Sequence, residues 1–370
     1  MPGAPRLLAA TLGVLALTGC AGASEDPATP RVAPAQTAVP SASASMLPAE
    51  PADVLTGLSA PWSVVVLSDG SALVSERDSA RILEFAPGGE VREVGIVQGV
   101  APGGEGGLLG LAVSADESAL YAYSTSASDN RVQRFALEGG AGARGLGAAT
   151  TIIDGLPRAG IHNGGRIAFG PDGMLYVATG DAGEPGAAQD RDTLAGKILR
   201  LTAEGDIPSD NPFPGSAVYS LGHRNVQGIA WSADGRMFAS EFGQDAADEL
   251  NVIEPGGNYG WPQVEGSGGA ASGFIDPVQE WPTDAASPSG IAVIGDTLYI
   301  ANLRGRVLRA VPVEDPSIST EHYAGAYGRL RAVTEAPDGA LWIVTNNTDG
   351  RGDPRDGDDR ILAVDPTVVR

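Results

Sequence analysis

The 370-residue chain contains 46 acidic and 24 basic side chains, which gives a formal net charge of -22 at pH 7. This charge argues against a nucleic acid partner, because phosphate binding requires a basic face. Hydrophobic residues make up 42% of the chain, which is enough for a sizeable core.

The first 50 residues are predicted to lie outside the folded domain. Residues 1–20 combine Arg6 with the short apolar run Leu7–Leu17 and end on Cys20, the only cysteine. Leu17–Cys20 resembles the lipobox of bacterial lipoproteins, although an ordinary signal peptide with a chance cysteine is the alternative. Residues 21–50 are rich in Ala, Pro, Ser and Thr, which predicts a disordered tether. We therefore expect an extracytoplasmic domain over residues 51–370, anchored to the outer face of the bacterial cell membrane only through a lipid on Cys20.

One β-hairpin pattern recurs six times along the predicted domain. Each copy has an apolar strand, a turn containing Asp and a second strand rich in β-branched and aromatic residues. The copies are Val64–Glu76, Gly110–Tyr123, Arg166–Thr179, Gly228–Glu241, Gly290–Ile300 and Arg331–Val344. Their turn aspartates are 42 to 62 residues apart, a period typical of propeller blades. The sequence therefore predicts an all-β fold, a six-bladed β-propeller of four-stranded antiparallel blades.

The two ends of the domain are predicted to share the last blade. Residues 360–364 have the pattern of a third strand, and residues 52–58 at the start of the domain can supply the fourth strand. This arrangement closes the ring without leaving an open sheet edge.

The third hairpin is predicted to bring two ionisable side chains together. His162 precedes its first strand and Asp181 follows its second strand, so both lie at the same end of the hairpin. Histidine has a pKa that suits a general base. A lone histidine is more often structural, so the residues around it have to decide its role.

Four arginines are expected at the same end of the ring, because they flank the first two strands of other blades. They are Arg224, Arg304, Arg329 and Arg331. Guanidinium groups at a channel mouth suit a planar ligand with several carboxylates or phosphates. The alternative is a structural network in which the arginines pair with Glu105, Asp181 and Glu241.

Two acidic segments raise the question of a metal site. Asp248 and Glu249 begin a cluster that continues to Tyr259, which suits a hard cation such as Ca²⁺ or is a solvated acidic loop. Residues 349–359 are also acidic, but arginines are interleaved there, and we expect a mobile surface loop.

Taken as an ordered set, five motifs resemble the soluble PQQ-dependent sugar dehydrogenases. This is the glucose/sorbosone dehydrogenase family, and the closest type is its aldose dehydrogenase members. The motifs are Gly107–Gly110, His162–Arg166, Gly180–Asp181, Leu221–Gly228 and Asn258–Pro262.

The resemblance implies that pyrroloquinoline quinone (PQQ) lies over the channel and that the enzyme oxidises the C1 hydroxyl of an aldose to a lactone. His162 would be the general base, Asp181 would orient it, and Arg224 would stabilise developing negative charge. The cofactor-binding positions would be Glu105, Arg224, Asn225, Arg304, Arg329 and Arg331. Glu105 replaces a glutamine of better-known members, and Arg304 replaces a lysine.

The resemblance also implies calcium. Gly243 and Gln244, the latter in place of a proline, match positions whose carbonyls bind Ca²⁺ at the quinone. Asp248, Glu249 and Tyr259 match a second, structural calcium site. A sugar substrate and an external electron acceptor would be the partners.

Two other functions remain compatible with the residues alone. One is a non-catalytic propeller that binds a polyanionic ligand or a surface partner. The other is a metal-dependent lactonase.

Overall fold

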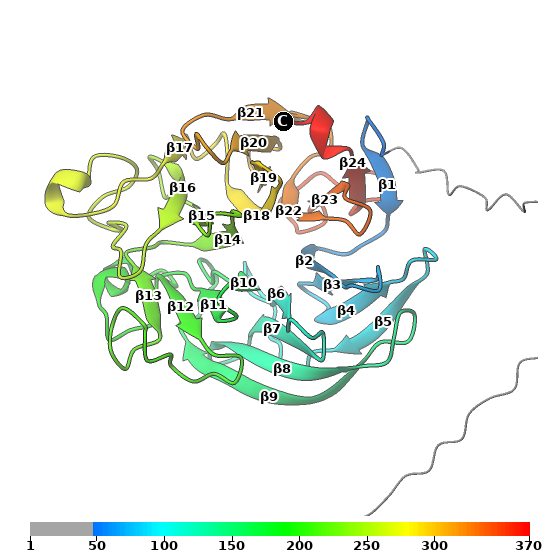
Figure 1. The fold of residues 1–370 in the computed structure, drawn as a ribbon, viewed down its shortest axis with the longest axis horizontal. Helices are drawn as coiled ribbons and strands as arrows, with labels where there is room; N and C mark the ends of the chain where they lie inside the picture. The colour runs from blue at the N-terminus through cyan, green and yellow to red at the C-terminus, as the bar shows by residue number, and fades with distance from the viewer. Residues whose placement is uncertain (1–46) are drawn as a thin grey trace, which may run out of the picture. The chain divides into compact units, whose positions relative to one another are not determined.

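Six four-stranded antiparallel sheets form a ring around a central axis in the computed structural model, which describes residues 47–370 (Figure 1). The predicted six-bladed β-propeller is therefore confirmed. The signal peptide, Cys20 and nearly all of the tether lie outside the described residues and stay predictions. At the end of the expected tether, the Pro48 carbonyl accepts a hydrogen bond from the Asp365 N–H at 2.7 Å.

The strands follow one another blade by blade. Blade one consists of β2 (Pro61–Val66), β3 (Ala72–Glu76), β4 (Arg81–Phe85) and β5 (Val91–Ile96), and blade two of β6 (Leu108–Val113), β7 (Ala119–Thr125), β8 (Asn130–Glu138) and β9 (Gly145–Leu156). Blade three consists of β10 (Ile167–Phe169), β11 (Leu175–Ala178), β12 (Lys197–Leu201) and β13 (Val218–Leu221), and blade four of β14 (Val226–Trp231), β15 (Met237–Glu241), β16 (Asp248–Ile253) and β17 (Gln279–Trp281). Blade five consists of β18 (Pro288–Ile294), β19 (Thr297–Asn302), β20 (Leu308–Pro312) and β21 (Thr320–His322).

Blade six closes the ring as the sequence predicts. It consists of β22 (Leu330–Glu335), β23 (Leu341–Thr345), β24 (Ile361–Val364) and β1 (Ala52–Leu55), with β1 paired to β24. Strands from the two ends of the described chain thus lie side by side (Figure 1). The helical segments of the described residues are three short 3₁₀ turns, η1 (Pro185–Gln189), η2 (Ala270–Ser272) and η3 (Pro366–Val368). Within residues 47–370, no helical segment has the length and apolar character that a membrane span requires.

The turn aspartates explain why each hairpin bends where it does. In five of the six turns, one carboxylate oxygen accepts the backbone N–H two residues further on, for example Asp172 from Met174 at 3.1 Å. This bond favours a tight turn, because the side chain replaces a backbone acceptor.

The apolar core is divided among the six interfaces between neighbouring blades. The interface of blades two and three, for example, contains Tyr121 and Val132 from one blade and Leu175 and Leu199 from the other. The other five interfaces contain equivalent clusters. Because the faces of neighbouring blades pack against each other, the loops at one end of the ring are brought to fixed positions around the channel.

Candidate active site

A chain of hydrogen bonds connects three side chains of blades three and four. His162 Nδ1 lies 2.7 Å from Asp181 Oδ1, and the Trp261 indole N–H donates to Asp181 Oδ2 at 2.8 Å. Asp181 is completely buried, whereas the His162 side chain is 12% exposed. Burial alone raises the pKa of Asp181, but hydrogen bonds from His162, the Gly183 N–H and Trp261 outweigh it and lower the pKa below its ordinary value. Asp181 is therefore an ionised acceptor that favours a proton on Nδ1 and leaves Nε2 free.

The backbone around His162 is held in an uncommon conformation. His162 has φ of +54°, which a non-glycine residue adopts only when its surroundings enforce it. Its N–H donates to Glu105 Oε2 at 2.8 Å, and its carbonyl lies so close to Gly180 that a Cβ there would be 1.9 Å away. Gly180 is therefore required for the approach of the two hairpin ends that places His162 beside Asp181.

The mouth of the ring contains a cavity of about 190 Å³ with five arginines in its wall. We call it the arginine cavity. Its lining residues are Trp62, Arg77, Glu105, Gln227, Phe242, Ser287, Leu303, Arg304, Arg329, Arg331 and Arg351. Arg224 adjoins this wall, because its Nη1 donates to the Phe242 carbonyl at 3.1 Å. The structure therefore brings the predicted arginines to the same mouth as His162, whose N–H is bound by the cavity residue Glu105.

Several donors at this mouth have no partner among the described residues. Buried nitrogens without a hydrogen bond include Nε of Arg224, Nε of Arg329, Nη2 of Arg166 and Nδ2 of Asn225. Arg331 is also buried, and it contacts only neutral acceptors, including Gln227 Oε1 at 2.7 Å and Asn346 Oδ1 at 3.1 Å. Burial lowers the pKa of Arg331 to about 9. Unsatisfied buried donors next to a cavity are suited to an anionic ligand.

The alternative of a structural ion-pair network holds for some of these groups. Arg329 Nη2 lies 3.2 Å from Asp349 Oδ2, whereas the Arg224 guanidinium forms no ion pair among the described residues and only the backbone N–H of Arg224 donates to Glu241. Glu105 pairs with Arg351 at 3.2 Å, in addition to its bond with the His162 N–H. Glu105 thus supports the backbone of His162, a contact that the sequence did not predict. Arg304 is exposed at the cavity rim and appears in no ion pair of the described residues.

Residues 349–359 form the predicted surface loop, in which most residues are exposed, but the fold holds the two ends of the loop. Asp349 and Asp359 are buried, and Arg351 lines the arginine cavity. Composition suggested exposure, but long-range partners such as Arg329 bury the aspartates. Sequence analysis also missed Arg77, although it directly follows the second strand of blade one, the same position that identified Asp181 in blade three.

The predicted calcium residues of blade four contact protein donors. Asp248 accepts the N–H groups of Gly243 and Ser287, and Glu249 accepts the Gly266 N–H at 2.7 Å and Asn251 Nδ2 at 3.0 Å. The Tyr259 hydroxyl donates to the Val252 carbonyl at 2.7 Å. Among residues 47–370, no group of three or more His, Cys, Asp or Glu side chains is arranged to hold a metal ion. A structural calcium site at these three residues stays a prediction.

Burial shapes the protonation of this acidic group. It raises the pKa of Asp248 to about 6, and burial together with the neighbouring Glu241 raises the pKa of Glu249 to about 8. Both shifts favour the protonated carboxyl groups as long as no cation is bound.

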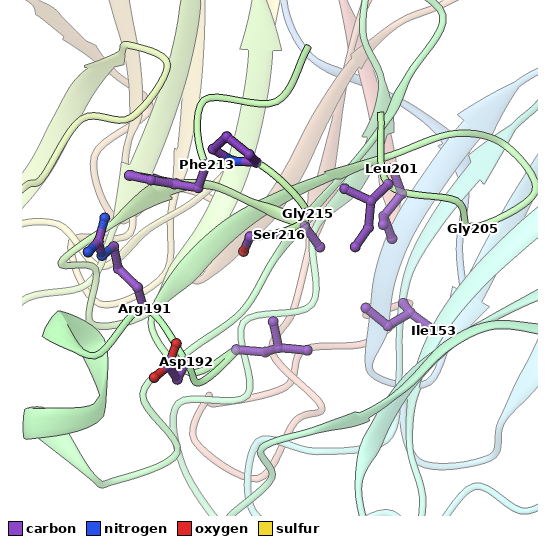
Figure 2. A pocket seen from close by; sticks show the side chains of 12 residues that line it. Ile153, Arg191, Asp192, Leu201, Gly205, Phe213, Gly215 and Ser216 are labelled. Atoms are coloured by element: carbon purple, nitrogen blue, oxygen red, sulfur yellow. The ribbon is translucent and has the colours of Figure 1, made fainter. Parts of the chain in front are cut away.

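A larger groove lies elsewhere, on blade three and the adjoining β9. It has a volume of about 750 Å³ and includes Ile153, Arg191, Phe213 and Ser216 (Figure 2). The Arg191 guanidinium lies 5.3 Å from the Phe213 ring centre. None of the predicted site residues line this groove, so its size does not make it the candidate active site.

Comparison with known proteins agrees with the motifs. The sequence model of the family described as glucose / sorbosone dehydrogenase matches residues 58–354. The PQQ-bound aldose sugar dehydrogenase of Streptomyces coelicolor is 52% identical, with 86% of this chain and 99% of that chain covered and a TM-score of 0.80. Aldose sugar dehydrogenase YliI of Escherichia coli is 29% identical over 78% of this chain and 88% of that protein.

A third relative matches over a shorter range. Quinoprotein glucose dehydrogenase B of Acinetobacter calcoaceticus is 33% identical over 58% of this chain, and the match spans about half of that protein (52%). The predicted oxidoreductase of the sugar dehydrogenase type is therefore confirmed. With most of its length inside the family model, the chain belongs to the glucose/sorbosone dehydrogenase family.

Proposed function

We propose that this chain is a PQQ-dependent dehydrogenase that oxidises the C1 hydroxyl of an aldose to the lactone. The observation that carries the proposal is the His162–Asp181 pair beside a cavity lined by five arginines, with unsatisfied buried donors on Arg329 and on the neighbouring Arg224 and Asn225. A family member that is 52% identical was solved with PQQ bound, which supports the same cofactor here.

The residues present fit the cofactor. PQQ is planar and carries three carboxylates, and the arginine cavity offers guanidinium groups that can bind each carboxylate through two N–H donors. Arg304, Arg329 and Arg331 would hold the carboxylates. The unpaired Nε of Arg224 and Nδ2 of Asn225 would meet the remaining oxygens. When bound, PQQ supplies the electron-pair acceptor that takes the hydride from C1, and the protein handles the proton.

His162 performs the proton transfer in this proposal. Asp181 holds the proton on Nδ1, so the lone pair of Nε2 is free to accept the proton of the C1 hydroxyl. Loss of that proton and of the hydride leaves a C1=O bond, which is the lactone. The ionised Asp181 stabilises the imidazolium that forms, since its charge lies 2.7 Å from the ring nitrogen. The Arg224 guanidinium stabilises negative charge that develops during the reaction.

Calcium enters the proposal through backbone groups alone. The carbonyl oxygens of Gly243 and Gln244 accept no backbone hydrogen bond in the described part of the chain, so they remain available as hard ligands. An ion there would act as a Lewis acid. Asp248, Glu249 and Tyr259 are not needed for this site.

The location of the enzyme follows from the N-terminal sequence. We propose that a lipid on Cys20 anchors it to the outer face of the cell membrane, where an external acceptor takes the electrons. A Cys20→Ser variant that still fractionates with membranes would count against the anchor.

Titration of the purified protein with PQQ, with and without Ca²⁺, tests the proposed function. We expect saturable binding, detected by the change in quinone absorbance, followed by sugar-dependent reduction of an artificial dye. A protein that binds no PQQ and reduces no dye across a panel of aldoses would refute the proposal. A protein that binds PQQ but oxidises no aldose would retain the cofactor and refute the substrate.

A further inference from the structure

The only lysine of the chain is completely buried beside the candidate active site. All other basic side chains among the 24 are arginines, yet position 197, at the start of β12, is a lysine with no exposed surface. A buried ammonium group is costly unless its donors are satisfied. Neither the proposed proton transfer nor the arginine cavity uses it.

Lys197 binds three backbone carbonyls that belong to one loop. Its Nζ donates to the carbonyls of Ala187 at 2.9 Å, Ala188 at 3.0 Å and Ala195 at 2.5 Å. These residues belong to residues 182–196, which connect Asp181 to β12 and which we call the Lys197 loop. The loop contains η1, and two of the three carbonyls lie in that turn. Each carbonyl oxygen has two lone pairs, so Ala187 and Ala188 can accept Nζ in addition to the N–H groups of Asp190 and Gly222.

Lysine suits this position better than arginine. An ammonium group is compact and directs three donors at three converging carbonyls, whereas a planar guanidinium is larger and arranges its donors in a fork. Burial lowers the pKa of Lys197 to about 8, and the charge of Asp190 opposes this in part. The group is still mainly charged at neutral pH.

The Lys197 loop is connected to Asp181 by two routes. Its last residue is bound to the residue that precedes Asp181, because the Gly196 N–H donates to the Gly180 carbonyl at 2.9 Å. The second route passes through Gln189, whose Nε2 donates to the Trp261 carbonyl at 2.7 Å and to Asn258 Oδ1 at 2.9 Å. Trp261 in turn donates its indole N–H to Asp181.

From these contacts we propose that Lys197 is a positioning residue for the reaction. It holds the Lys197 loop closed, and the loop holds Trp261 and Asp181 so that Asp181 keeps both its indole and its imidazole partner. The inference rests on the proposed function, since it concerns the alignment of the base His162.

The test compares Lys197→Met with Arg200→Met in the full-length protein loaded with PQQ. Arg200 lies at the far end of the same strand, is similarly buried and pairs with Asp172 and Asp210. Lys197→Met is expected to lower kcat about 10- to 100-fold, because small misplacements of catalytic groups have effects of this size. The KM for sugar and the PQQ affinity should change less than about twofold, and Arg200→Met should retain kcat.

Hydrogen exchange gives a readout that does not depend on activity. In Lys197→Met, we expect faster hydrogen exchange of the Gly183 amide and of the Trp261 indole N–H. These two groups donate to the Asp181 carboxylate, which His162 also binds. Unchanged exchange, or faster exchange with kcat within about twofold of the parent, would overturn the inference.

A second variant tests the inference if Lys197→Met does not fold. Gln189→Ala cuts the link to Trp261 without removing a buried charge, and it should lower kcat to a similar extent. A normal kcat in Gln189→Ala would contradict the inference. If the parent protein oxidises no sugar, the proposed function fails, and exchange at Gly183 and Trp261 still decides whether Lys197 holds Asp181 in place.

Discussion

The two sides of the channel mouth carry opposite charges and differ in how their polar groups are satisfied. On one side, Arg329 of the arginine cavity and the adjoining Arg224 each have a guanidinium nitrogen without a partner among the described residues, and Arg331 meets only neutral acceptors. On the other side, the acidic group of blade four comprises Glu241, Asp248, Glu249 and Glu265. Each of these carboxylates accepts hydrogen bonds from the protein, and Glu265 Oε1 alone accepts four backbone N–H groups of residues 244–247.

This difference in hydrogen bonding indicates which of the two charged clusters binds a ligand. A buried charged group whose hydrogen bonds are all made within the protein requires no ligand, and its role is structural. A buried donor without a partner loses its hydration and gains nothing until a ligand arrives. We therefore assign ligand binding to the arginine side and a structural role to the acidic side.

Replacing the base should have the largest effect on the arginine side. His162→Ala is expected to lower kcat about 10²- to 10⁴-fold, the range that general base catalysis contributes. PQQ affinity should not change, because the carboxylates of the cofactor are held by other residues. Steady-state dye reduction and a PQQ titration measure the two quantities separately. Loss of PQQ binding together with activity would show that position 162 is a cofactor contact and would contradict its role as base.

Replacing a buried cation that pairs with no carboxylate should weaken the binding of the cofactor. Arg331→Met is expected to reduce PQQ affinity about 10- to 100-fold, as for the loss of one charge-assisted hydrogen bond pair. The protein without cofactor should lose some stability, since the buried Asn346 Oδ1 loses its donors. Arg309→Met is the matched control, because Arg309 is equally buried but pairs with Glu321 outside the cavity. Equal loss of PQQ affinity in both variants would contradict the assignment.

The sequence could predict the groups that lie next to strands but not those that loops bring in. His162, Asp181 and the arginines flank strands whose ends meet at one mouth, so the hairpin pattern was sufficient to place them. The Trp261–Asp181 bond joins residues 80 positions apart, and the Glu105–Arg351 pair joins residues 246 positions apart. No local pattern encodes such pairs, because they depend on how blades four and six approach blades three and two. The six blades and the shared last blade were predictable because each blade repeats the same local pattern of strand, turn and strand.

Replacing a carboxylate of the acidic side should change the pH dependence of stability rather than the activity. The pKa of Glu249 is raised from 4.5 to about 8 in the folded protein, so the folded state binds the proton more tightly than the unfolded state. Its contribution to stability is therefore complete below pH 4.5 and is lost as the pH rises towards 8. Glu249→Gln keeps a neutral side chain of the same shape and should make the decrease in Tm over this range shallower. A decrease as steep as in the parent would contradict the raised pKa, and a Tm gain on adding Ca²⁺ that the variant loses would assign a calcium role to Glu249.

The smallest expected effect concerns the one carboxylate in the arginine cavity. Glu105 opposes an anionic ligand by its charge, but it also binds the His162 N–H and pairs with Arg351. Glu105→Gln retains an oxygen acceptor for the His162 N–H and removes the charge. We expect PQQ affinity to rise about two- to fivefold at low salt, the scale of one partly exposed charge interaction, and the gain to shrink as salt is added. A decrease in affinity would mean that Glu105 organises Arg351 for the ligand, and part of the cavity's positive wall would then depend on a negative side chain.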